Sequence, residues 1–209
     1  MAQLALEPVT WRVRALAAGG RIVADSQEAR LVLSDDAPPA YAFPLADTER
    51  DSLPARAWVP VDGAPGYALL AADHAGGILE EDEPVLGHPR SPFCRADAIA
   101  SSRHVRVELA GLALAESFRP LVLFETDEPT RFYLAQADVR LDLLEPSETV
   151  TVSPYLGRAV WFSARVAGDL HRDIAWTYRF PVLQMPRIAG LLAFRDDLVR
   201  ELEDGSQRA

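Results

Sequence analysis

The chain has 209 residues, a formal net charge of −10 and a sequence pI near 4.9, and 49% of its residues are hydrophobic. This composition suits a globular protein with a buried core, whereas the excess of acid disfavours binding to nucleic acid or to a membrane surface. All 21 basic residues are arginines, so lysine nucleophiles, Schiff bases and a P-loop lysine are excluded. The lack of lysine and asparagine indicates a GC-rich genome, for which we expect a bacterial source.

Neither a metal nor a cofactor is expected. The single cysteine, Cys94, cannot form an internal disulfide, and the four histidines lack the spacing of a zinc site. No stretch approaches the roughly 18 apolar residues of a membrane span, and the first residues lack the features of a secretory signal. We therefore predict a cytoplasmic protein, and its oligomeric state stays open.

An internal repeat becomes visible when Ser26 is set against Ser117. Identical residues then recur more often than average residue frequencies predict. The matched pairs are Ala24 with Ala115, Ser26 with Ser117, Asp36 with Asp127, Pro38 with Pro129, Ala46 with Ala137, Asp47 with Asp138, Asp51 with Asp142 and Leu53 with Leu144. We interpret the pattern as two copies of one module, of which the first lacks the segment corresponding to Glu145 to about Arg172.

The repeat sets the expected domain boundaries. Residues 9–83 form the truncated first copy, residues 84–102 a connector that contains Pro and His, and residues 103–204 the complete second copy. Further landmarks are Ala57-Trp58, matched with Ala175-Trp176, and Gly66, matched with Gly190. Each copy ends in an acidic segment that we expect to form a short helix, Asp73 to Glu83 in the first and Arg195 to Asp204 in the second.

The local patterns of the second copy predict strands. Two short runs, His104 to Leu109 and Leu112 to Ser117, flank Ala110-Gly111, which is the spacing of a β-hairpin. Apolar and charged residues alternate from Asp138 to Leu143, as in a half-buried strand, and a turn is expected at Glu145-Pro146-Ser147. The other expected strands are Leu121 to Glu125, Arg158 to Val166, Ile174 to Tyr178 and Ile188 to Phe194. We predict an all-β, mainly antiparallel protein of short strands and hairpins, with a short helix closing each of two related modules.

The stretch from Asp138 to Gly157, D-V-R-L-D-L-L-E-P-S-E-T-V-T-V-S-P-Y-L-G, closely resembles a corner of the family called domain of unknown function 427, sometimes labelled nucleotidyltransferase. The usual family wording there is L-L-E-P-S-D-T and then Cys-Pro-Tyr-Lys-Gly. The resemblance implies a two-copy member with a truncated first copy. Because this chain has Ser153 and Leu156 where the family usually has Cys and Lys, it has lost any chemistry that depends on that thiolate or amine.

The matching segments of the second copy are Ser102 to Leu109, Leu123 to Thr126, Arg131 to Leu134, Asp138 to Gly157, Ala175 to Tyr178 and Ile188 to Gly190.

Two catalytic constellations are weak. Asp138 and Asp142 lie four residues apart, so on an extended strand they are about 13 Å apart, too far to share one metal ion. Ser153 could act as a nucleophile if a histidine approached it, but no triad signature surrounds it. The sequence also has no glycine-rich phosphate loop leading into a helix, which leaves the nucleotidyltransferase label without a motif.

A group of aromatic residues with one arginine is the stronger candidate site. Its members are Arg131, Tyr133, Tyr155, Trp161, Trp176 and Tyr178. Such a group lines many small-molecule pockets, where the rings give apolar area and the guanidinium holds an anion. The alternative is that the tryptophans are core residues. His88 and Arg90 of the connector could cap the same pocket, or they belong to a rigid, solvated linker.

Strand alternation places Arg131 and Tyr133 on one face and Phe132 and Leu134 on the other, core-facing side. We therefore expect a module that binds a small, anionic molecule in its second copy. The alternative is a transferase-like or hydrolase-like enzyme acting on a small anion, degenerate in this member. A third possibility is that the first copy only covers a sheet face of the second.

Overall fold

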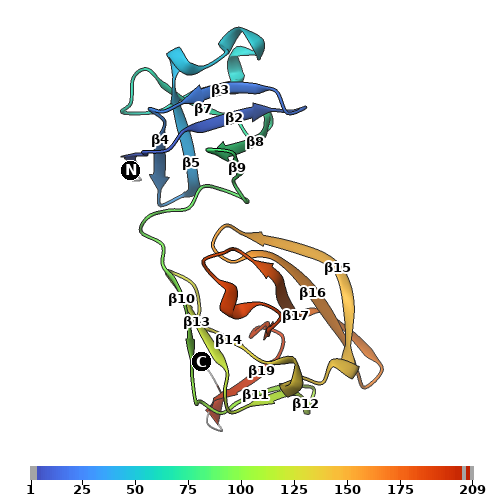
Figure 1. Ribbon diagram of the computed structural model, residues 1–209. Coiled ribbons are helices and arrows are strands. Elements are labelled where there is room, and N and C mark those ends of the chain that lie inside the picture. Colours follow the sequence, from blue (N-terminus) through green and yellow to red (C-terminus); the bar gives the residue numbers. More distant parts are fainter. Residues whose placement is uncertain (1–3, 204–205, 208–209) are drawn as a thin grey trace. The chain divides into compact units, whose positions relative to one another are not determined.

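The computed structural model describes residues 4–203 and 206–207, and the predicted all-β, mainly antiparallel fold is confirmed. The chain divides into two compact units, residues 1–91 (unit 1) and residues 92–209 (unit 2). Each unit is built from twisted antiparallel strands (Figure 1). Within the described residues the helices are 3-10 turns of three residues, and none is long and apolar enough to cross a membrane.

Unit 1 consists of two sheets that enclose one core. Its strands are β1 (Ala5–Pro8), β2 (Val13–Ala17), β3 (Ile22–Ser26), β4 (Arg30–Ser34), β5 (Ala37–Pro44), β6 (Trp58–Pro60), β7 (Tyr67–Leu70), β8 (Ala75–Glu80) and β9 (Glu83–Pro84). Three 3-10 helices, η1 (Leu45–Asp47), η2 (Arg50–Ser52) and η3 (Ala55–Ala57), lie between β5 and β6. The sheet orders are β1-β4-β5-β7-β6 and β3-β2-β8-β9. Val13, Val23 and Phe43 are fully buried in the core that these strands share.

Unit 2 has the same kind of architecture with a larger sheet. Its strands are β10 (Ala96–Ala100), β11 (Val105–Leu109), β12 (Leu112–Ser117), β13 (Leu121–Glu125), β14 (Arg131–Tyr133), β15 (Leu144–Ser153), β16 (Gly157–Val166), β17 (Asp169–Pro181), β18 (Leu192–Phe194), β19 (Arg200–Glu203) and β20 (Ser206–Gln207). The 3-10 helices are η4 (Gln136–Asp138), η5 (Leu141–Leu143) and η6 (Pro186–Ile188). Figure 1 shows β15, β16 and β17 as long neighbouring strands.

The sheets of unit 2 have the orders β12-β11-β19-β20, β10-β13-β14 and β15-β16-β17-β18. The last two are joined edge to edge, because the backbone groups of Leu134 and Leu192 exchange hydrogen bonds of 2.8 and 2.9 Å. The combined sheet buries apolar residues on both faces. Phe132 and Leu134 belong to one core cluster, while Tyr133 and Trp176 belong to another. This division confirms the predicted alternation along β14.

The strand pairings of the two units follow one order. The sheet β3-β2-β8-β9 matches β12-β11-β19-β20, and β1-β4-β5-β7 matches β10-β13-β14-β18. Isolated bridges recur at the matched positions, between Ala24 and Thr48 in unit 1 and between Ala115 and Val139 in unit 2. The long hairpin of β15 and β16 has no counterpart in the described residues of unit 1, where η2 is followed directly by η3 and β6.

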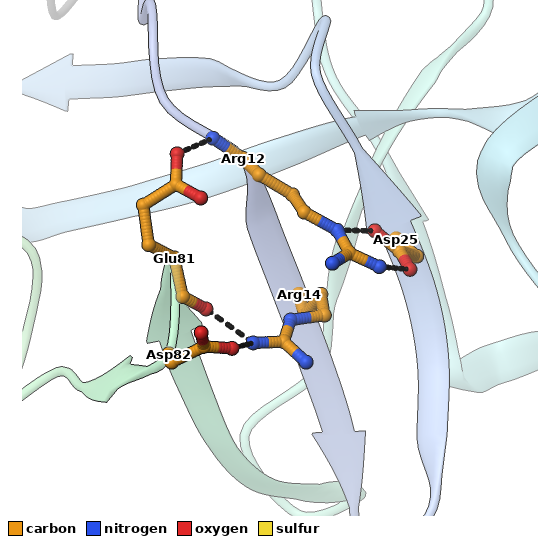
Figure 2. A network of polar contacts seen from close by, with 5 residues as sticks. All are labelled: Arg12, Arg14, Asp25, Glu81 and Asp82. Atoms are coloured by element: carbon orange, nitrogen blue, oxygen red, sulfur yellow. Dashed lines mark hydrogen bonds and ion pairs between the residues drawn. The ribbon is translucent and has the colours of Figure 1, made fainter.

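Charged side chains form ladders on the solvent side of β2 and β11. In unit 1 the Arg12 guanidinium binds both carboxylate oxygens of Asp25, and Arg14 binds Asp82 and the backbone carbonyl of Glu81 (Figure 2). In unit 2, Arg106 pairs with Glu108 at 2.8 Å and with Glu116 at 3.2 Å. Pairs of this exposed kind contribute little stability, but they keep the outer face of each sheet polar.

The two expected terminal helices are wrong, because both segments form strands. Residues 75–80 pair with β2 as β8, and residues 200–203 pair with β11 as β19. Pairing with an open strand edge overrides the helix propensity of acidic residues. Gly76 also disfavours a helix. In β8 its lack of a side chain allows a close approach to β2, since a Cβ at this position would lie 2.1 Å from the Ala17 carbonyl oxygen.

The expected strand from Asp138 to Leu143 is also wrong. The segment forms the two turns η4 and η5, with only Val139 bridged to a strand. Asp138 accepts a 2.7 Å hydrogen bond from the buried Ser117 hydroxyl, so its side chain anchors a turn and does not join a ladder of exposed charges. The alternation of charged and apolar residues there is not an alternation of burial, because Val139 is buried whereas Leu141 is 43% exposed.

Two other expectations differ in detail. The predicted turn at Glu145-Pro146-Ser147 is a bulge within β15, where the pairing with β16 shifts register. A bulge admits Pro because it interrupts the ladder. The expected strand from Ile188 to Phe194 is shortened to β18 by η6 and the left-handed Gly190. The hairpin of β11 and β12 is confirmed, and Ala110 and Gly111 both have positive φ, as its two-residue turn requires.

The proposed equivalence of Trp58 and Trp176 is out of register by one residue. Trp58 pairs with Leu70, whereas in unit 2 the residue that pairs with Phe194, the match of Leu70, is Ala175. A shift of one residue along a strand moves a side chain to the opposite face. Trp58 therefore lies in the central core of unit 1, while Trp176 faces the other side of its sheet.

Candidate functional site

A pocket of about 250 Å³ opens on the face of the unit 2 sheet that carries Tyr133 and Trp176. Strands β13 to β17 and the turn between β13 and β14 supply its lining. The lining residues are Leu123, Glu125, Glu128, Pro129, Arg131, Tyr133, Thr151, Ser153, Leu156, Trp161, Trp176 and Tyr178. We call this site the β14 pocket. Five of the eight residues predicted for the site line it.

The aromatic walls of the β14 pocket come from three strands. Trp161 of β16 lies beside Trp176 of β17, with ring centroids 5.0 Å apart and planes inclined by 39°. Their register explains the contact, since these two residues are directly paired across the strands. Tyr133 and Tyr178 form a second pair, 6.5 Å apart and inclined by 38°. Tilted pairs at such distances are favourable arrangements of aromatic rings.

Hydrogen bonds fix the orientation of both indoles. Trp161 Nε1 donates to Thr151 Oγ1 at 2.9 Å, and Trp176 Nε1 donates to the Tyr133 hydroxyl at 3.2 Å. The Tyr178 side chain is only 6% exposed, and its hydroxyl has no hydrogen-bond partner among the residues that the structure describes. Burial raises the pKa of both tyrosines, Tyr133 and Tyr178, so both hydroxyls are protonated. The Tyr178 hydroxyl is thus a polar group that the protein leaves for another partner.

Arg131 lies at the edge of the pocket, and its charge is already compensated. One guanidinium nitrogen is 2.7 Å from a carboxylate oxygen of Asp196, in the segment that follows β18. The guanidinium carbon is 5.8 Å from the centroid of the Trp176 ring, within the range of a cation–π contact. Arg131 therefore lines the pocket beside an acid and a ring, although its buried Nη1 makes no hydrogen bond within the described residues.

Glu125 ends β13 and lines the pocket. Burial, and then the neighbouring charge of Glu128, raises the pKa of Glu125. Within the described residues no group donates a hydrogen bond to this carboxylate. A carboxylate that loses water without gaining donors is unfavourable, and such groups cluster at functional sites.

The corner of β15 and β16 closes one side of the pocket. Ser153 Oγ accepts hydrogen bonds of 3.2 Å from the backbone N–H groups of Tyr155 and Leu156. Gly157 follows with a φ of 114°, and a Cβ there would lie 3.1 Å from Pro181. Only glycine fits this turn without strain. The turn places Leu156, which is 5% exposed, against the pocket.

Three predicted site residues lie elsewhere. Tyr155 packs against the cluster around Trp176 and forms a hydrogen bond with Cys94, so it supports the corner and is not part of the lining. His88 and Arg90 belong to unit 1, where the charge of Arg90 acts on the Tyr41 phenol. The prediction that these two residues cap the pocket stays untested.

Sequence reasoning missed Glu125, Thr151 and Asp196. Glu125 ends an apolar run that indicated only a buried strand, yet it shares the parity of Leu121 and Leu123 on that strand, which could have placed it beside the pocket. Thr151 and Trp161 are on adjacent strands, and only the register of β15 and β16 brings them together. The described residues contain no group of three or more metal-ligating side chains.

The family model described as Domain of unknown function (DUF427) matches residues 97–205, which is just over half of the chain. The chain belongs to this family. No curated protein matches it. The matched range includes every residue that lines the β14 pocket, so the pocket lies wholly within the DUF427 domain. Ser153 and Leu156, which stand where the family usually has Cys and Lys, both line the pocket.

Proposed function

We propose that the DUF427 domain of this protein binds a small molecule in the β14 pocket. The observation that carries the proposal is a preformed cavity whose polar groups are not all satisfied by the protein. Its walls are rigid rings, whereas the Tyr178 hydroxyl and the Glu125 carboxylate lack partners among the described residues. Mostly apolar pockets with a few convergent polar groups are typical of small-molecule sites.

We further infer that the two units are copies of one module and that only unit 2 retains the site. The Ser26–Asp47 hydrogen bond of 2.6 Å in unit 1 and the Ser117–Asp138 bond in unit 2 support the duplication, as does the shared strand order. Unit 1 lacks the β15–β16 hairpin and is in this view the truncated copy.

The residues of unit 1 at the matched positions support the same division of roles. Strand register places Ala40 at the position of Arg131, Ala42 at that of Tyr133 and Val59 at that of Trp176. Each replacement removes a ring or a charge from the wall of the site. An equivalent pocket in unit 1 would therefore have neither the aromatic walls nor the guanidinium.

Binding is favoured over catalysis because Ser153 is poorly placed to act as a nucleophile. Its oxygen already accepts two backbone hydrogen bonds, and the described lining contains no histidine that could act as its base. In unit 2, His104 pairs with Glu116 at 2.8 Å on the outer face of β11. The corner in this member thus supports a wall and not a reactive centre.

A fragment screen by ligand-observed NMR tests the proposal, with neutral, cationic and anionic compounds. Hits should bind against Trp161 and Trp176. Their binding free energy should weaken by about 1 kcal/mol in Tyr178→Phe, which removes one hydroxyl. Tyr67→Phe is the matched control, because the Tyr67 hydroxyl donates to the Glu28 carbonyl in unit 1. If all hits bind Tyr178→Phe and Trp176→Phe as tightly as the natural protein, the pocket is not the binding site.

A further inference from the structure

We propose that the β14 pocket selects a small organic cation, with an ammonium group seated against its aromatic walls and facing Glu125. This inference rests on the proposed binding function and names the ligand class. It departs from the expectation of an anionic ligand, which followed from Arg131 alone. The charges and hydrogen bonds around the pocket carry the argument.

The first step concerns the indoles. Both indole N–H groups are satisfied by hydroxyl oxygens of the protein, Thr151 for Trp161 and Tyr133 for Trp176. A ligand is therefore not required as their acceptor, and the rings can contribute only their faces. Ring faces carry the negative part of the aromatic quadrupole, so they attract cations.

The second step concerns the acids. Glu125 and Glu128 both line the pocket, and Glu125 is about half buried without a hydrogen-bond donor among the described residues. A ligand ammonium would supply the missing positive charge. An anionic ligand would add a third negative group to the same small space, which Coulomb repulsion opposes.

The third step concerns Arg131, the only basic residue in the described lining. Its Nη1 lies 2.7 Å from an Asp196 carboxylate oxygen, which offsets its charge although the geometry of this contact is not that of a hydrogen bond, and its guanidinium carbon lies 5.8 Å from the Trp176 centroid. An anion would have to compete with Asp196 for the guanidinium, whereas an ammonium group that faces Glu125 leaves the Arg131–Asp196 pair in place. The remaining charge of the lining is negative.

The last step is size. A cavity of about 250 Å³ is at the small end of ligand sites. The nearly buried Tyr178 hydroxyl offers one further hydrogen bond to a polar end of the ligand. A compact ammonium compound with one hydroxyl or carbonyl group fits these requirements.

The experiment compares three probes of nearly equal shape: choline, its neutral carbon analogue 3,3-dimethylbutan-1-ol, and the anion pivalate. Binding is followed on the natural protein by ligand-observed NMR and by quenching of tryptophan fluorescence. We expect choline to bind at least about tenfold more tightly than the alcohol, and pivalate most weakly. Glu125→Gln should weaken choline binding by about tenfold and leave the alcohol unchanged.

Asp127→Asn is the matched control, because it removes one charge from the same turn at a residue outside the described lining; it should change choline binding by less than about twofold. If pivalate or the alcohol binds as tightly as choline, the cation inference fails while the pocket proposal stands. If choline fails to bind but other fragments bind against Trp161 and Trp176, the proposed ligand class is again overturned. If no fragment of any charge binds against these two tryptophans, the proposed binding function itself fails.

Discussion

The Ser117 hydroxyl donates a hydrogen bond of 2.7 Å to Asp138, across 21 residues of sequence, and so ties the end of β12 to the turn η4. Ser117 is 2% exposed, and its oxygen also accepts the Arg119 backbone N–H at 3.2 Å. The bond therefore fixes a turn and the exit of a strand together. Ser26 and Asp47 form the same link in unit 1.

Ser117→Ala should lower the free energy of unfolding by about 1–3 kcal/mol, because it leaves a carboxylate oxygen and a backbone N–H without their buried partner. Urea denaturation measures the change. Ser26→Ala should cost a similar amount in unit 1, whereas Ser34→Ala, at a half-buried serine near a turn, serves as the mild control. An unchanged midpoint for Ser117→Ala would mean that the bond carries no net stability.

Phe132→Ala and Arg131→Ala should differ sharply in stability although the residues are neighbours. Phe132 is 1% exposed within the central core, so its removal leaves a cavity and should cost about 3–5 kcal/mol. Arg131 pairs with an exposed aspartate at the pocket edge, and its loss should cost about 1 kcal/mol. Thermal denaturation of the two variants compares them. Equal and severe unfolding would make Arg131 a structural residue.

Glu125 should make stability depend on pH. Its folded-state pKa is raised above 4.5 by burial and by Glu128, so the folded protein holds this proton more tightly than the unfolded chain. The stability that it adds is fully present below pH 4.5 and is lost as the pH rises through the folded-state pKa. Glu125→Gln should therefore unfold at higher urea than the natural protein at neutral pH, and this advantage should disappear under acid conditions.

The pH experiment on Glu125 needs one control, because another carboxylate lies nearby. Glu128 is the other carboxylate that acts on Glu125, while the pKa values of Tyr133, Tyr178 and Cys94, which also interact with Glu125, are raised. Glu128→Gln measures how much of the change in stability comes from the charge of Glu128. A pH profile for Glu125→Gln that parallels the natural one would contradict the effect of burial.

Gly76→Ala should destabilise unit 1 by at least about 1–3 kcal/mol, since the new Cβ would meet the Ala17 carbonyl oxygen at 2.1 Å and force β2 and β8 apart. Gly111→Ala gives the contrast, because its Cβ would meet nothing within 4 Å and only its positive φ of 79° opposes the change. Hydrogen exchange should show faster exchange along β2 for Gly76→Ala alone. Protected amides in β2 of that variant would contradict the steric argument.

A chelator should leave the melting temperature unchanged, because neither the sequence nor the described residues bring metal-ligating side chains together. Thermal denaturation with and without EDTA, together with elemental analysis, provides the measurement. One tightly held metal ion per chain would overturn the prediction.

The alternation of side chains between the two faces of a strand was the most informative pattern in the sequence. Alternation along Arg131, Phe132 and Tyr133 predicted which side chains face the central core, because a strand puts successive residues on opposite faces whatever the rest of the fold does. The same reasoning failed for Asp138 to Leu143. The segment forms two 3-10 turns around the bridged Val139, and Leu141 is exposed, so a pattern of charged and apolar residues over so short a segment did not reflect burial.

A lining residue could be predicted only where the alternation along its own strand decides which face it occupies. Tyr133 and Trp176 follow from strand faces, but the contact of Arg131 with Asp196 depends on a loop after β18, and no local pattern carries it. The pairing of Trp58 likewise depends on a shift of one residue, which comparison of two segments of unequal length does not resolve. Such relationships arise from register, which tertiary packing sets.

The β15–β16 hairpin enters the fold between η5 and β17, a point at which unit 1 simply continues from η2 to η3 and β6. Unit 1 still encloses a core around Val13 and Phe43 without such a hairpin. The hairpin is therefore a separable addition to the fold, and it carries Thr151, Ser153, Leu156 and Trp161, a third of the residues that line the β14 pocket. Substitutions within residues 144–166 would therefore reshape one wall of the pocket while the surrounding strands keep the scaffold folded.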